Sequence, residues 1–381
     1  MSSPSVSELP AQIRAPAPAW APAPATAVRP PLVFARPRFT NTIIQGQEGT
    51  RFRLSVNVYR NPDPQALRIA NTVVLMAHAN GLHKELWEPL INQAWTARNQ
   101  GRSGGAPHIA AFIAWDVRCQ GDSAPLNPAS SEDPDRWSWV DIAQDGLAVW
   151  QWVQQVVPAA QRRFVLGVGH SMGANSLLQM SMMKPQLFRH LYLYEPCGPV
   201  WGDSEEDLAT RPLEDFSMSV AAARRHCWYP SRDAAYTMLR RKPFFRNWTD
   251  LHFSLWLEYG LRPGVNRNGE PGFVTKTTPN DEAKTFLGVG PYNMLDQLRT
   301  SFATPSTVWA GSESFFCKMG SVNTDPKIRN TIHFIAAQME RSTVVDLEDA
   351  SHMLPFEHMG YDPCTTYFLD HSSKIAWAPK L

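Results

Sequence analysis

Residues 164–173, F-V-L-G-V-G-H-S-M-G, decide which fold this chain can adopt. The run begins as an apolar segment typical of a buried strand, and residues 174–183 after it have the composition of a helix that Pro185 closes. A strand that turns sharply into a helix needs small residues where the two elements approach, and Gly169 and Gly173 flank Ser171 at two residues either side. The pattern G-x-S-x-G between strand and helix marks Ser171 as the candidate nucleophile.

The segments around this turn alternate between strand and helix. Residues 52–59 alternate like an antiparallel strand, and apolar residues at steps of three and four over 136–157 predict a helix. Further strands are expected at 72–77, 109–115, 191–194, 306–310 and 342–347, and further helices near 326–340 and 355–370. This order favours an α/β fold with a mostly parallel central sheet and helices on both faces.

Two stretches break the alternation. Residues 1–35 are dominated by Pro, Ala and Ser, a composition that cannot support a core and favours an extended arm. Between about 201 and 305, Pro, Trp, Phe and Arg are dense and no apolar strand is recognisable, which indicates an inserted, mainly helical lid. The predicted organisation is an arm at 1–35, the first part of the core at 36–200, the lid at 201–305 and the second part of the core at 306–381.

Composition narrows the class of protein. With 36 Lys and Arg against 35 Asp and Glu, the formal charge of +1 gives no general field for nucleic acid. The five cysteines are scattered without C-x-x-C spacing, so we expect a reducing compartment and no metal site. The chain has no run of about 18 apolar residues, so no transmembrane segment is predicted. The sequence does not determine the oligomeric state, and a homodimer is one of the alternatives.

A serine nucleophile needs a base within hydrogen-bond reach and a carboxylate that orients the base. In folds of this kind the chain order is Ser, acid, His. His352 lies just after the last predicted strand, in the run E-D-A-S-H-M-L-P that begins at Glu348, so its loop is expected at the same sheet edge as Ser171. His352 is therefore the candidate base.

Two positions at that edge can supply the acid. Glu195 follows the strand after the nucleophile helix, and Glu313 follows the strand at 306–310, where a G-x-x-D pattern would have its aspartate at Ser314. We favour Glu195, because an acid at a buried strand end is costly unless it is paired. Glu313 remains the alternative acid.

The oxyanion hole needs two backbone N–H donors aimed at the developing negative charge. The amide of Met172, which opens the helix after the nucleophile, is one candidate. The other is expected in the loop after the strand at 72–77, at Asn80 or, failing that, Leu82. His78 in this loop and Asp116 after the next strand are expected to order the loops without taking part in the chemistry.

Four motifs, in this order along the chain, resemble those of a known superfamily. They are the loop H-A-N-G from His78, the run D-V-R-C-Q-G-D-S from Asp116, the turn G-H-S-M-G around Ser171 and the run S-H-M-L-P-F from Ser351. Over about residues 40–375 the chain resembles the α/β-hydrolase superfamily. The run H-A-N-G-L-H-K-E-L-W-E-P-L looks like a segment of fungal peroxisomal acyl-CoA hydrolases of mycophenolic acid and toxin biosynthesis. The yeast peroxisomal lipase is a more distant relative in this comparison.

The resemblance implies a serine hydrolase that cleaves an acyl-CoA thioester in the peroxisome and uses no bound cofactor. It places the acid after the strand that follows the nucleophile, at Glu195, although the family has Asp there. The C-terminal Pro379-Lys380-Leu381 resembles the family's tripeptides for the peroxisomal import receptor, with proline in place of the serine of S-K-L. A carboxylester or acylglycerol lipase with the same triad, and an inactive binding module of the same fold, are the alternatives.

The predicted lid is rich in arginine and aromatic residues. Arg224, Arg225, Arg240 and Arg241 are candidate contacts for the phosphates of CoA, and each could equally be a solvated surface charge. The aromatic residues could line an acyl pocket or form the core of the lid: Phe244, Phe245, Trp248, Phe253 and Trp256.

Overall fold

The computed structural model describes residues 29, 32, 34–99, 108–128, 137–198, 217–288, 290, 293–314, 331–357 and 368. Its main element is an eight-stranded sheet in the order β1-β2-β4-β3-β5-β6-β10-β11. β1 and β2 pair antiparallel, β2 also pairs antiparallel with β4, and the other neighbours are parallel. The strands are β1 (Thr40–Gln45), β2 (Arg53–Arg60), β3 (Thr72–Ala77), β4 (Ile109–Trp115), β5 (Phe164–His170), β6 (His190–Tyr194), β10 (Ser306–Gly311) and β11 (Ser342–Leu347).

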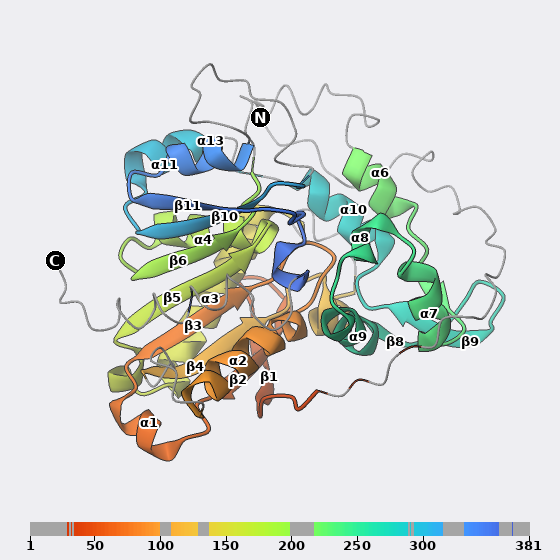
Figure 1. Cartoon of the computed structure of the whole chain (residues 1–381), viewed down its shortest axis with the longest axis horizontal. Helices are drawn as coiled ribbons and strands as arrows, with labels where there is room; N and C mark the ends of the chain where they lie inside the picture. The colour runs from red at the N-terminus through yellow and green to blue at the C-terminus, as the bar shows by residue number, and fades with distance from the viewer. Residues whose placement is uncertain are drawn as a thin grey trace.

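Both faces of the sheet are buried along its central strands, which are mainly apolar. Along β3, Val73 and Leu75 enter one core while Val74 and Met76 enter the other. The first core contains residues of α3 (Trp139–Val156), α4 (Met172–Met183), α11 (Met294–Ser301) and α13 (Thr331–Ala337). The second contains residues of α2 (Glu88–Asn99) (Figure 1). This is the α/β-hydrolase arrangement that the sequence predicts.

Several predicted elements have the expected bounds. The strands at 72–77, 109–115 and 342–347 are β3, β4 and β11, and β5 runs to His170, directly before Ser171. Two elements were not predicted: β1, whose side chains are mostly exposed, and the six-residue helix α1 (Pro64–Ile69). Most of the predicted closing helix at 355–370 lies outside the described residues, as does most of the arm at 1–35.

Residues 217–287 lie beside one end of the sheet (Figure 1). They contain five helices: α6 (Ser217–Ala223), α7 (Arg232–Leu239), α8 (Pro243–Arg246), α9 (Asp250–Tyr259) and α10 (Pro279–Leu287). They also contain a three-stranded antiparallel sheet of β7 (Trp228–Tyr229), β9 (Pro271–Thr275) and β8 (Leu261–Val265). These strands were not predicted, because they are short and partly exposed.

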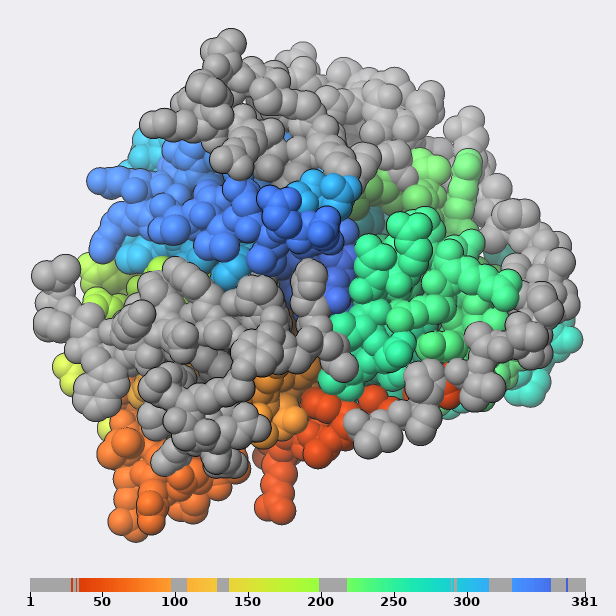
Figure 2. Space-filling model, in the orientation of Figure 1, coloured from red at the N-terminus to blue at the C-terminus, as the bar shows by residue number. Residues whose placement is uncertain are grey.

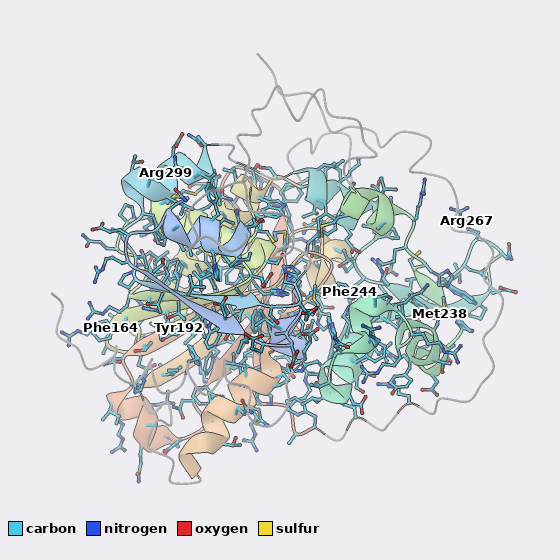
Figure 3. The ribbon with its side chains drawn as sticks, turned by 45° about the horizontal axis from the view of Figure 1, so that its top comes forward. Phe164, Tyr192, Met238, Phe244, Arg267 and Arg299 are labelled. Atoms are coloured by element: carbon cyan, nitrogen blue, oxygen red, sulfur yellow. The ribbon has the colours of Figure 1, made fainter. Side chains whose placement is uncertain are left out.

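The lid helices share a hydrophobic cluster with loops of the core. Phe245, Trp248, Phe253 and Trp256 are buried in it together with Leu82, Leu86 and Phe356. Of the five aromatic residues that the sequence left open as pocket lining or lid core, four therefore pack in the lid core, whereas Phe244 is exposed. In Figure 3, Phe244 and Met238 lie on the lid side, apart from Phe164 and Tyr192 of the sheet. Figure 2 shows the lid surface in contact with residues of the C-terminal part of the core.

The lid boundaries at 201 and 305 remain predictions. Residues 199–216 lie outside the described part of the chain. Met294 and Leu298 of α11, inside the predicted interval, pack in the main core beside α4.

Candidate active site

Ser171 lies between β5 and α4 with φ 53° and ψ −118°, a backbone conformation that residues other than glycine rarely adopt. The turn is this tight because strand, helix and the end of β3 nearly touch. A Cβ on Gly173 would lie 2.3 Å from the Ala77 carbonyl oxygen, and one on Gly169 would lie 2.8 Å from the Ala174 nitrogen. The two glycines are therefore required by space, and the strand–turn–helix context predicted for Ser171 is present.

His352 and Glu195 come together at the same edge of the sheet. His352 follows β11, Glu195 follows β6, and the His352 Nδ1 lies 3.1 Å from Glu195 Oε2. Glu195 is fully buried, while Ser171 and His352 are 8% and 9% exposed. An Nδ1–H that donates to the carboxylate leaves Nε2 of the imidazole with a lone pair. This is the tautomer that a general base for a serine needs.

Two further donors hold the Glu195 carboxylate. The Gly311 N–H donates to Oε1 at 2.7 Å, and the Ser314 hydroxyl donates to Oε2 at 2.6 Å. Ser314 is the position where the sequence pattern would have an aspartate, and here it supports the glutamate from the neighbouring strand. Sequence reasoning missed both donors, because the pairing of β6 with β10 brings them together.

Glu313, the alternative acid, lies in the turn after β10 with its side chain exposed. Its backbone N–H donates to the Ala350 carbonyl oxygen at 2.9 Å, which ties this turn to the loop of His352. The contact with His352 Nδ1 and the complete burial favour Glu195 as the acid, and the assignment remains a proposal.

His170, the residue before Ser171, supports the backbone of His352. Its Nε2 donates to the His352 carbonyl oxygen at 2.8 Å, and the two rings lie 5.0 Å apart. Burial, with His352 nearby, holds the pKa of His170 well below its ordinary value, so its ring is neutral. The sequence carried no signal for this role.

Cys197 is in contact with Ser171. The hydroxyl of Ser171 lies 3.4 Å from Cys197 Sγ. Burial raises the pKa of the Cys197 thiol to about 12, although the hydrogen bond with Ser171 acts in the opposite direction. The thiol is therefore protonated at neutral pH and is a weak nucleophile.

The two candidate oxyanion donors lie on neighbouring elements. Met172 is the first residue of α4, where N–H groups lack partners within the helix. Asn80 lies in the loop after β3, which we call the oxyanion loop (residues 78–83). In the same loop the Leu82 N–H donates to the Ala79 carbonyl oxygen at 3.2 Å, so the fallback donor is already engaged. This favours Asn80, whose role remains a proposal.

His78 organises the oxyanion loop, as the sequence predicts. Its Nε2 accepts from the Val117 N–H at 3.1 Å, so Nδ1 carries the proton that it donates to the Ala79 carbonyl oxygen at 2.8 Å. Burial lowers the pKa of His78. The ring is a neutral brace between the loops after β3 and β4.

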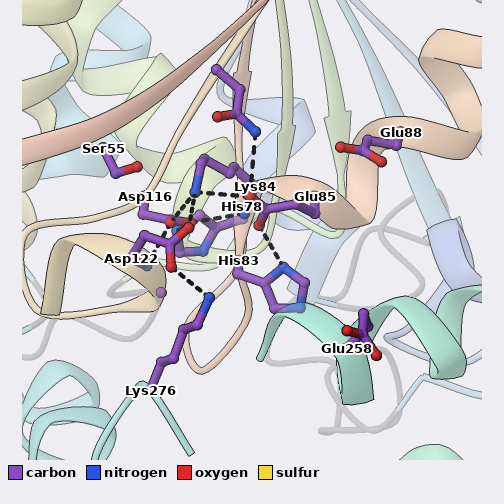
Figure 4. Close-up of polar contacts among 12 residues, drawn as sticks. Ser55, His78, His83, Lys84, Glu85, Glu88, Asp116, Asp122, Glu258 and Lys276 are labelled. Carbon is purple, nitrogen blue, oxygen red and sulfur yellow. Dashed lines mark hydrogen bonds and ion pairs between the residues drawn. The ribbon is translucent and has the colours of Figure 1, made fainter. Parts of the chain in front are cut away.

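A charged group that sequence reasoning missed lies beside this loop; we call it the Lys84 cluster, made of Lys84, Glu85, Asp116, Asp122 and Lys276 (Figure 4). Lys84 Nζ is 2.7, 2.8 and 2.9 Å from the carboxylates of Asp116, Asp122 and Glu85, and Lys276 from the lid reaches Asp122 at 2.5 Å. Burial alone would lower the pKa of Lys84, but these carboxylates raise it above its ordinary value.

The three carboxylates of this cluster lie close enough together to resemble a metal site. The ammonium group of Lys84 lies among them and offsets part of their negative charge. Asp116 also accepts from the backbone N–H groups of Lys84 and Asp122, both at 2.8 Å. Asp116 therefore orders two loops, in agreement with the sequence analysis.

The four arginines predicted to contact phosphate differ in their surroundings. Arg224 and Arg241 are exposed. Arg225 pairs with Glu282 at 2.5 Å, and Arg240 donates to Asp250 and to the carbonyl oxygens of Phe245 and Trp248. The charges of Arg225 and Arg240 are thus already matched within the lid, which leaves Arg224 and Arg241 as the better candidates.

The motifs and the geometry agree with a comparison against protein families. A profile of the alpha/beta hydrolase family matches residues 74–361, which include Ser171, Glu195 and His352. The chain belongs to this family, and the resemblance and fold class predicted from the sequence are confirmed.

More particular similarities are distant. The chain is 32% identical over 126 residues, 32% of its length, to the type I acyl-CoA thioesterase mpaH' of Penicillium brevicompactum, and the match spans only 25% of that relative. The structure matches the peroxisomal α/β-hydrolase Lpx1 of Saccharomyces cerevisiae with a TM-score of 0.68 at 17% identity, over 90% of this chain and 91% of Lpx1. It also matches the thioesterase domain of the curacin biosynthetic pathway, with a TM-score of 0.57 at 16% identity, over 87% of this chain and 99% of that domain.

Two predictions concern location in the cell. None of the helices in the described ranges has both the length and the apolar character needed to cross a bilayer. The tripeptide Pro379-Lys380-Leu381 lies outside the described residues, so the import signal remains a prediction.

Proposed function

We propose that this protein is a serine hydrolase that cleaves an acyl-CoA thioester, or a related ester, through an acyl-enzyme. The observation that supports this most directly is the contact of His352 Nδ1 with the buried Glu195 carboxylate, beside a serine held in a strained turn. The distant similarity to acyl-CoA thioesterases and the predicted terminal tripeptide support a thioester substrate and a peroxisomal location. The pathway would be one of secondary metabolites or fatty acids.

In this proposal His352 Nε2 takes the proton of Ser171 while Oγ attacks the carbonyl carbon. Negative charge develops on the carbonyl oxygen, where the N–H groups of Met172 and Asn80 would stabilise it. The C–S bond breaks, and His352 returns the proton to the departing CoA thiolate. Water, deprotonated by His352, then attacks the acyl-enzyme and releases a carboxylic acid and Ser171. Glu195 keeps its charge and orients the imidazole throughout.

The test compares hydrolysis of acyl-CoA thioesters with that of matched glycerol and p-nitrophenyl esters, for wild type and for Ser171→Ala. We expect thioester turnover that Ser171→Ala lowers by about 10⁴-fold or more, and labelling of wild type alone by a fluorophosphonate. Turnover of oxygen esters without thioesters would favour the carboxylester or acylglycerol lipase. An enzyme that neither turns over any ester nor takes the label would be a binding module.

A further inference from the structure

The loop after β4, with the motif D-x-R-x-x-G-x-S, has no part in the chemistry above, yet it contacts the oxyanion loop. Gln120 of this motif is fully buried. Its Nε2 donates to Asn80 Oδ1 at 2.5 Å, and its Oε1 accepts from the Gly81 N–H at 2.9 Å. One carboxamide thus bonds to two successive residues of the oxyanion loop.

The Asn80 side chain also reaches the lid. Its Nδ2 donates to the Glu282 carbonyl oxygen of α10 at 3.0 Å. Gly81 has φ +77°, and a Cβ there would lie 2.9 Å from the Glu282 carboxyl group. The oxyanion loop is therefore held between Gln120 on the core side and α10 on the lid side.

We propose that Gln120 is a positioning residue that fixes the backbone N–H of Asn80 in the oxyanion hole. The bonds to the Asn80 side chain and to the next amide leave the intervening backbone little freedom to turn. Correct aim of an oxyanion donor matters, because a displacement of about 1 Å in a catalytic site can cost about 10²-fold in rate. The inference rests on the proposed function and adds a residue that acts through Asn80.

Two substitutions test the two hydrogen bonds that Gln120 makes with the oxyanion loop. Gln120→Leu removes both hydrogen bonds at nearly the same volume. Gln120→Glu keeps an acceptor for the Gly81 N–H and puts a carboxylate oxygen, which cannot donate when ionised, against Asn80 Oδ1. With p-nitrophenyl butyrate as the probe, we expect Gln120→Leu to lower kcat by about 10- to 100-fold with KM changed less than about threefold. Gln120→Glu should lower kcat as well, because its carboxylate repels Asn80 Oδ1.

A readout specific to the oxyanion separates positioning from general damage. A trifluoromethyl ketone adds to the serine and forms a hemiketal whose oxyanion needs the hole, whereas the matched methyl ketone binds without that charge. We expect Gln120→Leu to weaken the trifluoromethyl ketone by about 10- to 100-fold and the methyl ketone by less than about threefold. Equal weakening of both compounds would show a structural role only and would overturn the inference.

Asn127→Leu is the matched control. Asn127 is fully buried after the same loop, and its Nδ2 donates to the carbonyl oxygens of Arg53, Arg118 and Ser123 at 2.7–3.0 Å. Its loss should lower the melting temperature much as Gln120→Leu does, with kcat kept within about threefold, because none of these bonds reaches the oxyanion loop.

The outcomes for Gln120 and for the proposed function are distinguishable. A wild type that cleaves no ester and takes no fluorophosphonate overturns both. If the wild type is active and Gln120→Leu folds but keeps its kcat within about threefold, only the positioning role of Gln120 is overturned. Should Gln120→Leu not fold, Gln120→Glu decides in the same way.

Discussion

Two polar regions lie at the carboxyl edge of the sheet, and they balance buried charge differently. In the region of the proposed triad (Ser171, Glu195 and His352), which we call the triad region, the Glu195 carboxylate is held by a backbone N–H, a hydroxyl and an imidazole, none of which carries a fixed charge. In the Lys84 cluster, an ammonium group meets three carboxylates, and a second lysine joins from the lid.

The difference fits the work proposed for each region. A base that gains and loses a proton needs a carboxylate that remains responsive to the imidazole, and a fixed cation beside Glu195 would weaken its effect on His352. A loop that only has to keep its place can be held by fixed opposite charges, because removing one partner would leave an uncompensated buried charge. The comparison can be tested by removing one charge from each region.

The largest effect is expected in the triad region. Glu195→Gln removes the charge and offers His352 Nδ1 an amide group, which favours the wrong tautomer of the imidazole. We expect kcat for p-nitrophenyl butyrate to fall by about 10³- to 10⁴-fold, with little change in KM.

Glu313→Gln is the matched control, since Glu313 is exposed at the same sheet edge. Its kcat should stay within about twofold of wild type, as is usual for a surface substitution. The reverse order of the two variants would make Glu313 the acid and leave Glu195 as a structural carboxylate.

In the Lys84 cluster, substitution should affect stability. Lys84→Met leaves three carboxylates without their central cation, so we expect the free energy of unfolding to drop by about 3–5 kcal/mol at neutral pH, measured by urea denaturation. Lys276→Met removes the other lysine that contacts Asp122, at the edge of the cluster, and should cost less than about 1 kcal/mol. Equal losses would mean that Lys84 gains nothing from its buried position.

The pH dependence of this loss has a definite sign. Burial alone would raise the pKa of Glu85, but the charge of Lys84 reverses this and holds the pKa below its ordinary value of 4.5. Such a carboxylate stabilises the protein above pH 4.5, and the benefit is lost as the pH falls through the folded pKa. The gap between wild type and Lys84→Met should therefore narrow in acid.

The placement of Ser171, Glu195 and His352 at strand ends could be predicted from the sequence, because each follows a recognisable strand. Their action as a triad remains a proposal. Ser171 has its flanking glycines, His352 follows the last predicted strand, and Glu195 follows the strand after the nucleophile helix. The support of Glu195 by Ser314 could not be predicted, since it depends on the pairing of strands more than 100 residues apart.

The Lys84 cluster had no recognisable signal. A lysine beside a glutamate in a loop is ordinarily a pair on the surface, and only the folded chain brings Asp116, Asp122 and Lys276 to it. The small lid sheet was not predicted either. Its strand β7 has only two residues, too few to show the alternating pattern of a strand.

At neutral pH, the smallest effect is expected at the other end of β4. His108 precedes this strand as Asp116 follows it, but neither of its ring nitrogens has a hydrogen-bond partner among the described residues. Burial lowers the pKa of His108 from 6.5 to about 4. Between these values the unfolded chain binds a proton that the folded protein excludes, so stability falls as the pH drops.

His108→Phe should remove that proton uptake without removing a hydrogen bond. We expect the unfolding free energy of the variant to depend less steeply on pH, by up to about 1.4 kcal/mol per pH unit in this window. Above about pH 8 the two curves should run parallel, because the histidine is then neutral in both states. Parallel curves at every pH would mean that His108 is solvated or paired in the folded protein. The buried polar residues at both ends of β4 would then be compensated, His108 by such a partner and Asp116 by Lys84.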